Sequence, residues 1–343
     1  MSVHNSGKEL AGSFRAVFAA EPDGPSGRLV TLRREELPAE PVTVRVAYSS
    51  LNYKDGLAVT GKGKVVRRFP LVCGIDLAGE VETSADSKWR PGDQVIATGY
   101  GLGEEHWGGF AELARLRPEW LVRVPDGRDA LWAMTLGTAG LTAMLCVLEL
   151  ERHGASPRAA GDDPVVVTGA AGGVGSVAVA LLAKLGYNVA AVSGRPEQAA
   201  YLRSLGATEV LPRAELADAP ARALDKERFF AGVDSVGSST LASVLRMTRY
   251  GGCVAACGLA GGADLPTTVH PFILRGVTLV GVDSVRTPLE LRTQAWARLA
   301  DELPAELLGE MRSVEPLGRV PDLAEDIIAG RTRGRVVIDL SQR

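Results

Sequence analysis

Two patterns of hydrophobic and polar positions divide the chain. Over residues 14–125, short runs with the alternation of β-strands are separated by Gly and Pro turns, and the runs cover residues 14–19, 42–49, 74–82, 94–98 and 121–124. Closely spaced short strands of this kind predict an all-β, partly barrel-like unit. A long apolar stretch with helical spacing follows, from about residue 129 to residue 151, and His153-Gly154 marks its end.

After residue 163 the pattern changes to short apolar strands that alternate with helical stretches. The apolar runs begin near residues 165, 189, 208, 233, 253 and 277, at intervals of about one strand plus one helix. Such a ladder predicts an α/β unit with a doubly wound parallel sheet and helices on both faces. Residues 213–226 are expected to form a surface helix or loop, and helical spacing resumes over 289–308. The β-like run 335–340 could return to the first unit.

A glycine-rich turn links the first strand of this second half to the helix after it. Residues 165–176 read VVVTGAAGGVGS, and apolar positions continue along one helical face until Gly186. Glycines let the backbone approach a pyrophosphate, and a helix N-terminus presents free N–H groups to its negative charge. Between a strand and a helix, the loop predicts a dinucleotide-binding site. A purely structural turn is the alternative.

The end of the next strand distinguishes between the two nicotinamide dinucleotides. NAD-binding units usually place Asp or Glu there to hold the ribose 2′-hydroxyl. Here the strand ends in Ser193-Gly194-Arg195, whose hydroxyl and guanidinium suit a 2′-phosphate. Arg213, just past the third strand, is either a second contact for that phosphate or a solvated surface residue. The sequence therefore predicts NADPH rather than NADH.

The first half lacks the ligands that a zinc alcohol dehydrogenase of this layout would need. Its cysteine and histidine content beyond the amino-terminal tail is limited to Cys73 and His106, so we expect no bound metal and interpret His106 as a polar loop residue. Carbonyl reduction of the alcohol dehydrogenase type would lack its Lewis acid. Reduction of an activated C=C bond requires less, namely a placed hydride donor and hydrogen-bond donors for the oxygen that gains charge.

A dense set of polar groups follows the strand over residues 42–49. Asn52 and Tyr53 could donate hydrogen bonds to a substrate carbonyl or to the nicotinamide, or could be turn residues that satisfy local backbone. Asp76 is expected to position other groups. The basic loop 62–68 either meets the phosphates of a large substrate or is a solvated charged loop.

Composition narrows the classes of protein further. The chain has 343 residues, of which 46% are hydrophobic and 23% are charged, enough for two compact domains. Lys and Arg number 38 against 41 Asp and Glu, a net charge of −3, which argues against a nucleic-acid partner. No apolar run reaches the ~20 residues of a membrane span. The first dozen residues lack the regions of a signal peptide, so we expect a cytoplasmic protein without a membrane partner.

Taken together, these motifs resemble the zinc-free, quinone-oxidoreductase-like branch of the medium-chain dehydrogenase/reductase superfamily, and within it the acrylyl-CoA reductase family. The resemblance spans about residues 14–340. It rests on nine stretches, at residues 49–55, 60–64, 74–79, 106–109, 137–140, 172–175, 193–195, 257–262 and 271–276.

The resemblance implies both a fold and a reaction. The fold is a barrel-like, GroES-like catalytic β domain over residues 13–137, completed by residues 305–343, with a Rossmann NADPH-binding domain over residues 138–304. The reaction is the NADPH-dependent reduction of acryloyl-CoA to propanoyl-CoA, by an oxidoreductase acting on CH–CH groups. An NADPH-dependent quinone or enone reductase is the alternative, and a dinucleotide-binding protein without catalysis is a third possibility.

The resemblance also implies a set of site residues. The candidates for catalytic roles are Asn52 and Tyr53, from their polar groups, and Asp76, which stands where a zinc-dependent relative would carry a metal-binding histidine. The residues that would hold NADPH are Tyr53, Ala171, Gly172, Gly173, Val174, Ser193, Gly194, Arg195, Arg213, Leu259, Ile273 and Ser284. The apolar run 277–282 would leave an exposed edge as the last strand of the sheet, and the resemblance implies that it pairs with its copy in a two-fold homodimer.

Overall fold

The computed structural model describes residues 12–21, 27–217, 222–303 and 305–342, and the chain divides into two compact units. Unit 1 comprises Met1–Thr138, Val285–Thr293 and Arg312–Arg343, and unit 2 comprises Ala139–Ser284 and Gln294–Met311. The division differs from the expected boundaries at residue 138 and over residues 285–293, which fall in unit 1, and over residues 305–311, which fall in unit 2. Most of the amino-terminal dozen lies outside the described residues.

Unit 1 is built mainly from antiparallel strands, as the alternation in the sequence predicts. Its seven-stranded sheet runs in the order β15-β16-β3-β5-β6-β8, with β7 also paired to β3, and a smaller sheet runs β2-β1-β4. The strands are β1 (Ser13–Ala19), β2 (Gly27–Arg33), β3 (Val42–Leu51), β4 (Leu71–Val72), β5 (Asp76–Ser84), β6 (Gln94–Thr98), β7 (Leu113–Leu116), β8 (Leu121–Arg123), β15 (Arg312–Pro316) and β16 (Arg335–Asp339). The sequence pattern did not reveal β2, β4, β7 or β15.

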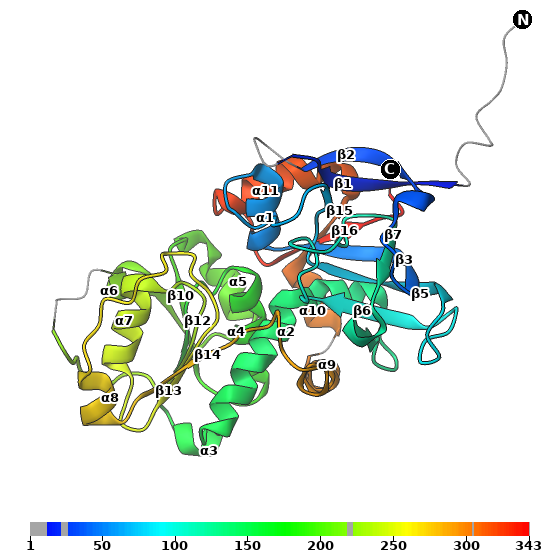
Figure 1. The fold of residues 1–343 in the computed structure, drawn as a ribbon. Coiled ribbons are helices and arrows are strands. Elements are labelled where there is room, and N and C mark those ends of the chain that lie inside the picture. The colour runs from blue at the N-terminus through cyan, green and yellow to red at the C-terminus, as the bar shows by residue number, and fades with distance from the viewer. Residues whose placement is uncertain (1–11, 22–26, 218–221, 304, 343) are drawn as a thin grey trace, which may run out of the picture. The chain divides into compact units, whose positions relative to one another are not determined.

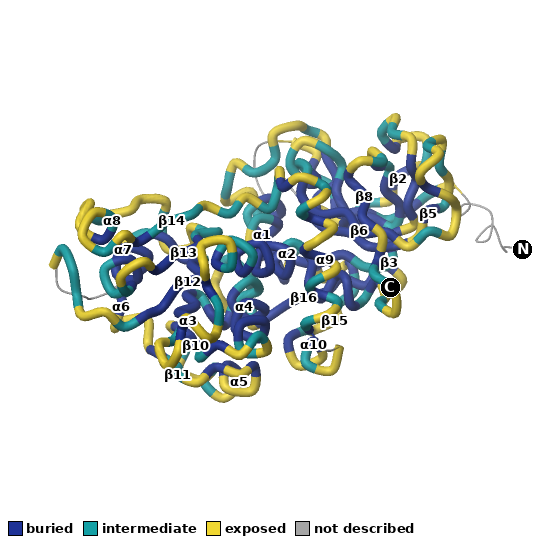
Figure 2. The backbone as a smooth tube through the Cα atoms, turned by 90° about the horizontal axis from the view of Figure 1, so that it is seen from below, coloured by how far each residue is buried: buried dark blue, intermediate teal, exposed yellow. Residues whose placement is uncertain are grey.

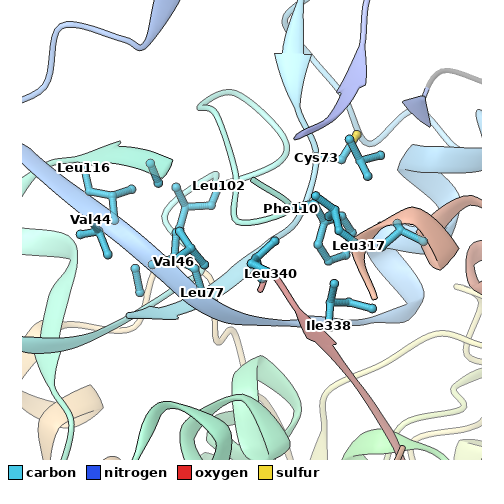
Figure 3. Packing of buried hydrophobic residues seen from close by; sticks show 14 of the residues in the cluster. Val44, Val46, Cys73, Leu77, Leu102, Phe110, Leu116, Leu317, Ile338 and Leu340 are labelled. Carbon is cyan, nitrogen blue, oxygen red and sulfur yellow. The ribbon is translucent and has the colours of Figure 1, made fainter. Parts of the chain in front are cut away.

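One apolar cluster fills the interior of unit 1. Figure 3 shows Val44, Leu77 and Phe110 packed with Ile338 and Leu340 from the carboxyl end of the chain. β16 pairs antiparallel with β3, so the last strand does return to the first unit, as expected. The carboxyl-terminal strand is part of this core through Ile338. Burial of each such aliphatic side chain stabilises the fold by about 1.5–3 kcal/mol.

A short helix replaces the turn that the sequence indicated after β3. Helix α1 (Tyr53–Thr60) begins after Asn52, whose backbone is extended, and ends at Gly61 in the left-handed region. Asn52 donates its backbone N–H to Asp55 Oδ2 at 2.8 Å, the reciprocal half of a capping box. The side chains at the end of β3 are thereby fixed by a helix start rather than by a flexible turn.

Unit 2 carries a six-stranded parallel sheet in the order β11-β10-β9-β12-β13-β14. This is the strand order of a doubly wound dinucleotide-binding fold, which confirms the predicted ladder. The strands are β9 (Val165–Val167), β10 (Val189–Ser193), β11 (Glu209–Pro212), β12 (Ala231–Asp234), β13 (Cys253–Ala256) and β14 (Thr278–Gly281). Figure 1 shows helices α4 (Gly173–Lys184) and α7 (Ser238–Met247) on either side of this sheet.

The remaining helices are shorter or lie at the ends of the strand ladder. They are α3 (Pro157–Ala160), α5 (Ala199–Ser204), α6 (Ala214–Ala217), α8 (His270–Arg275), α9 (Leu289–Glu302), α10 (Ala305–Met311) and α11 (Val320–Ile328). The helical stretch expected over 289–308 is therefore two helices. Helix α6 occupies part of the segment expected as a surface helix or loop, and residues 218–221 of that segment lie outside the described residues.

Helix α2 (Ala130–Arg152) is long and apolar enough to cross a membrane by length and composition, which the sequence analysis did not anticipate. However, 83% of its most apolar window is buried inside the protein, and Figure 2 shows the helix mostly in dark blue. The expected single helix is also interrupted at Gly137, where φ is 52° and ψ is −153°. These features are typical of a core helix.

Candidate active site

The first candidate group, in unit 1, is built around the buried carboxylate of Asp76, the first residue of β5. Its Oδ2 accepts hydrogen bonds from Ser50 Oγ at 2.5 Å, Asn52 Nδ2 at 2.8 Å and the Thr138 N–H at 2.9 Å. Its Oδ1 accepts one from Thr138 Oγ1 at 2.5 Å. A fully buried carboxylate needs such partners, and Asp76 therefore ties together the end of β3 and the middle of α2.

Arg335, the first residue of β16, is also buried, and its guanidinium group lies next to the carboxylate of Asp76. Its Nη2 is 4.0 Å from Asp76 Oδ2 and donates to Ser50 Oγ at 2.8 Å. Burial lowers the pKa of Arg335, and the nearby Asp76 and Asp55 carboxylates oppose that shift. Sequence reasoning missed Arg335 because no local motif marks an arginine at the start of an otherwise apolar strand.

The side-chain amide of Asn52 is fully engaged in this network. Its Nδ2 donates to Asp76 Oδ2 at 2.8 Å and to Asp55 Oδ2 at 3.1 Å, and its Oδ1 accepts from Arg335 Nη1 at 3.1 Å. The Ser50 carbonyl oxygen is a third acceptor at 3.2 Å, so the two hydrogens of the amide nitrogen are taken up within the fold. The geometry therefore does not support the idea that Asn52 donates to a substrate, and favours a role in orienting the start of α1.

Asp55 is a second buried carboxyl group in the cluster. Its Oδ1 accepts the N–H of Ile75 at 2.9 Å, and its Oδ2 accepts the N–H of Asn52. Burial, and then the neighbouring Asp76, raise the pKa of Asp55 to about 7, although the hydrogen bonds it accepts oppose this. Sequence reasoning noted this residue only as part of the polar stretch 49–55.

Gly137 makes room for the cluster. Its φ of +52° lies in the region that favours glycine, and a Cβ there would come within 2.5 Å of both Asp76 Oδ2 and Ser50 Oγ. The next residue, Thr138, gives its N–H to Asp76, which thus acts as a distant cap for the second part of α2. The interruption of α2 and the buried carboxylate form one structural unit.

Tyr53 differs from the other predicted catalytic residues in its exposure. It is the first residue of α1, its side chain is 43% exposed, and it directly follows Asn52. The next residue, Lys54, pairs through Nζ with Glu104 Oε1 at 2.8 Å. The structure thus brings Asn52 and Asp76 together in the interior and leaves the Tyr53 ring accessible at the surface of unit 1.

The second candidate group, in unit 2, is the glycine loop between β9 and α4. Gly169 has a φ of +59°, and a Cβ there would lie 2.5 Å from Ser235 Oγ, while a Cβ on Gly175 would strike the carbonyl oxygen of Gly169. Gly172 precedes α4 and offers no side-chain cap. The loop is therefore tight, and the first N–H groups of α4 stay available to an anion such as a pyrophosphate.

Three polar residues expected near a 2′-phosphate lie together beside this loop. Ser193 Oγ accepts the N–H of Arg195 at 3.1 Å, and Arg195 Nη2 donates to the carbonyl oxygen of Ala171 at 3.2 Å. A Cβ on Gly194 would lie 3.2 Å from Arg213 Cζ, so that guanidinium lies against the same turn. One hydroxyl and two guanidinium groups beside a glycine loop fit a dinucleotide with an extra phosphate.

A buried polar pair holds the carboxyl ends of β9 and β12 together. Thr168 Oγ1 donates to Asp234 Oδ1 at 2.6 Å, and the N–H of Gly237 donates to Asp234 Oδ2 at 2.8 Å. Burial raises the pKa of Asp234, against the effect of these hydrogen bonds. This pair supports the edge of the sheet where ligands bind in such folds, and the sequence analysis missed it.

The remaining expected cofactor residues lie on later segments of unit 2. Leu259 follows β13 and is 63% exposed, Ile273 lies on α8 and is 70% exposed, and Ser284 follows β14 and is half-buried. Exposed leucine and isoleucine side chains of this size are available to an apolar ligand surface. In the part of the chain that the structure describes, no group of three or more His, Cys, Asp or Glu side chains is arranged to hold a metal ion.

Two family models match the chain in the order of its two units. The alcohol dehydrogenase GroES-like domain matches residues 38–126, and the zinc-binding dehydrogenase model matches residues 173–301. Together with the strand order of unit 2, they define the medium-chain dehydrogenase/reductase class. The described residues do not fit the zinc in the second model's name, and we derive no role for that metal.

Individual relatives narrow the class. Probable acrylyl-CoA reductase AcuI of Escherichia coli is 52% identical over 329 residues, which cover 96% of this chain and all of the relative. Acrylyl-CoA reductase AcuI of Ruegeria pomeroyi is 53% identical over 89% of this chain and 92% of its own length. The crystal structure of E. coli YHDH with bound NADPH superposes with a TM-score of 0.92 at 52% identity, covering 95% of this chain and 100% of that one. The chain belongs to the acrylyl-CoA reductase family.

Proposed function

We propose that this chain reduces the C=C bond of acryloyl-CoA to give propanoyl-CoA, with oxidation of NADPH to NADP⁺ and uptake of one proton. The observation that carries the proposal is the identity of 52–53% with two acrylyl-CoA reductases over about nine-tenths of the chain or more. The NADPH in the E. coli YHDH structure supports the choice of cofactor. The same choice follows from the groups at the end of β10, where a hydroxyl and guanidinium groups stand in place of an acid.

The glycine loop and the turn after β10 would hold the cofactor. Backbone groups of the loop and the start of α4 bind the pyrophosphate, and the turn binds the 2′-phosphate, because both offer hydrogen-bond donors next to positive charge. Leu259, Ile273 and Ser284 would contact the rest of the dinucleotide. The phosphate-binding set is Ala171, Gly172, Gly173, Val174, Ser193, Gly194, Arg195 and Arg213.

Bound NADPH supplies a hydride, and the protein must stabilise the negative charge that develops on the thioester oxygen more than it stabilises the ground state. Tyr53 is our candidate donor, because its side chain is accessible and its place at the start of α1 is fixed by the Asn52–Asp55 cap. Asn52 and Asp76 act as positioning residues. Arg335 and Ser50 hold that pair in place from the neighbouring strands.

Steady-state assays of NADPH oxidation test the reaction directly. Acryloyl-CoA, crotonyl-CoA and a benzoquinone are compared side by side with one preparation of the enzyme. We expect the highest kcat/KM for acryloyl-CoA. A clear preference for the benzoquinone would instead favour the quinone reductase alternative, and oxidation with none of the three would leave a dinucleotide-binding protein without this catalysis.

The proposal also includes a homodimer and a cytoplasmic location. β14 is the last strand of the sheet in unit 2, and its residues are half-buried or exposed. Helix α8, directly before it, exposes apolar side chains that include Val269 at its start and Leu274. An unpaired edge beside exposed apolar residues favours pairing with a second copy across a two-fold axis.

A further inference from the structure

A pocket of about 420 Å³ opens on unit 1, and none of the residues assigned above lines it. Its walls come from residues 38–40, 68–71, 105–107 and 115–120, which are far apart in the sequence. The volume lies in the usual range of small-molecule sites. The wall at residue 68 is the end of the basic loop 62–68, which the proposed function has not yet used.

Aromatic rings form part of this pocket. The ring centroids of His106 and Trp120 lie 4.7 Å apart, and the Arg117 guanidinium carbon lies 5.1 Å from the centre of the Trp120 ring. Trp107 is half-buried and lines the same space. Burial and then Arg117 lower the pKa of His106, which favours its neutral imidazole. Flat neutral rings of this kind provide stacking surfaces for a nucleobase.

The pocket also carries cationic groups, and Arg68 differs from the others. Arg117 Nε donates to Glu40 Oε1 at 3.2 Å, and Arg115 Nη1 donates to the Pro38 carbonyl oxygen at 3.4 Å. Arg68 is exposed and makes no hydrogen bond or ion pair with any residue that the structure describes. Among the lining arginines, its guanidinium is therefore the one that no described residue holds by a hydrogen bond or ion pair, and guanidinium groups suit phosphates.

An ion pair and a backbone hydrogen bond link this pocket to the helix that carries the candidate donor, Tyr53. Glu105 lines the pocket, and the preceding residue, Glu104, pairs with Lys54 at 2.8 Å and accepts the backbone N–H of Arg67 at 2.8 Å. Lys54 directly follows Tyr53 on α1. These contacts connect the helix that carries Tyr53 to a segment that lines the pocket, both within unit 1.

We propose that this pocket binds the 3′-phosphorylated ADP end of the CoA thioester. The base lies against Trp107 and His106, and Arg68 binds a phosphate. This inference rests on the proposed function in that the substrate is a CoA thioester, and it adds the subsite that recognises the part of CoA remote from the reacting bond. Binding energy from remote parts of a substrate lowers KM when it is expressed equally in the ground and transition states.

The test compares Arg68→Gln with a matched control, Arg28→Gln. Arg28 lies on β2, is exposed, and has no hydrogen bond or ion pair among the described residues. Each variant is assayed with acryloyl-CoA and with the acryloyl thioester of N-acetylcysteamine, which lacks the nucleotide. We expect Arg68→Gln to raise KM for acryloyl-CoA about three- to tenfold with little change in kcat, the size of one exposed charged contact. KM for the short thioester stays unchanged, and Arg28→Gln changes neither.

Calorimetric titration of CoA into protein saturated with NADPH separates this inference from the proposed reaction. We expect Arg68→Gln to lower the affinity for CoA by a factor similar to its effect on KM. This expectation holds whether or not the wild type reduces acryloyl-CoA. The assignment of the pocket to the nucleotide would be overturned if the wild type and Arg68→Gln bound CoA with equal affinity. It would also be overturned if Arg68→Gln raised KM equally for acryloyl-CoA and for the N-acetylcysteamine thioester. Wild-type protein that binds CoA through Arg68 but does not reduce acryloyl-CoA would overturn the reaction alone.

Discussion

Tyr53 carries the chemical part of the proposal at the scale of single residues. Tyr53→Phe keeps the ring and removes only the hydroxyl. If that hydroxyl stabilises the developing charge, kcat and kcat/KM fall together by roughly 10²–10³-fold in steady-state assays. Tyr250→Phe is the control, because Tyr250 is also an exposed tyrosine, on unit 2. An unchanged kcat would leave Tyr53 as a residue that only packs against the substrate or the cofactor.

In the proposed function, Arg195 is the residue that favours NADPH over NADH. Arg195→Ala removes a guanidinium beside Ser193 and Gly194, and we expect the affinity for NADPH to fall by about 1.5–3 kcal/mol, the range for hydrogen bonds to charged groups. NADH has no 2′-phosphate and should lose little. Fluorescence titration with both cofactors measures the difference. Arg195 also donates to Ala171 in the glycine loop, so equal losses for the two cofactors would mean that it supports the loop instead.

The buried carboxyl group of Asp55 is expected to make the free energy of unfolding depend on pH. Its pKa of about 7 in the folded state lies above the ordinary value of 3.8, so the folded protein binds more protons than the unfolded chain between these two values. The free energy of unfolding therefore decreases as pH rises through this window, by up to about 1.4 kcal/mol per pH unit.

Urea unfolding of the wild type and of Asp55→Asn, at about pH 5 and about pH 8, measures this effect. The variant cannot titrate, although it loses part of the acceptor set for Asn52 and Ile75 and is expected to be less stable overall. We expect the wild type to lose more stability than the variant between the two pH values. Parallel losses would show that Asp55 does not titrate in this window.

At the scale of elements, α2 and the buried carboxylate depend on each other through Gly137. Gly137→Ala puts a Cβ against Asp76 and Ser50 and also strains a positive φ. We expect a loss of about 2–4 kcal/mol in the free energy of unfolding, measured with denaturant. Gly127→Ala is a matched control, because Gly127 has a φ of +74° with open space around it. Equal losses in the two variants would mean that φ alone, and not the clash, sets the cost.

The same scale shows which elements the sequence could predict. The inner strands of unit 2 were visible because β9, β10, β12 and β13 are apolar and almost wholly buried. All six strands also recur at intervals of about one strand plus one helix. Helix α1 was missed because it is only eight residues long, too short for a clear apolar period, although Asn52 and Asp55 form its capping signal. β7 and β15 were missed because each is short and gains its stability from pairing with distant strands.

At the scale of the whole molecule, the proposed dimer follows from the edge strand of unit 2. β14 pairs with β13 on one side and with no other strand of the described sheet on the other. If a second copy pairs with it, light scattering at micromolar concentration returns twice the chain mass of 36.1 kDa. The monomer mass at that concentration would contradict the dimer.

The sequence by itself determined the dinucleotide-binding fold of unit 2 and the position of its glycine loop. Glycine positions, an apolar ladder and the residues that end β10 are local signals, and Ser193, Arg195 and Arg213 indeed lie together beside Ala171. Local signals suffice there because in a parallel sheet the residues that end neighbouring strands meet at one edge.

Only the tertiary structure decided how the polar groups of unit 1 are used. Arg335 reaches Ser50, Asn52 and Asp76 from the other end of the chain, and α2 breaks at Gly137 to admit the Asp76 carboxylate. A sequence shows which groups can form hydrogen bonds but not which partners satisfy them once buried. From the sequence, Asn52 could donate to a substrate. In the structure, its amide nitrogen donates within the fold, where Asp55, Asp76 and the Ser50 carbonyl oxygen are its acceptors. Burial forces such groups to pair within the fold, and chain topology chooses the partners.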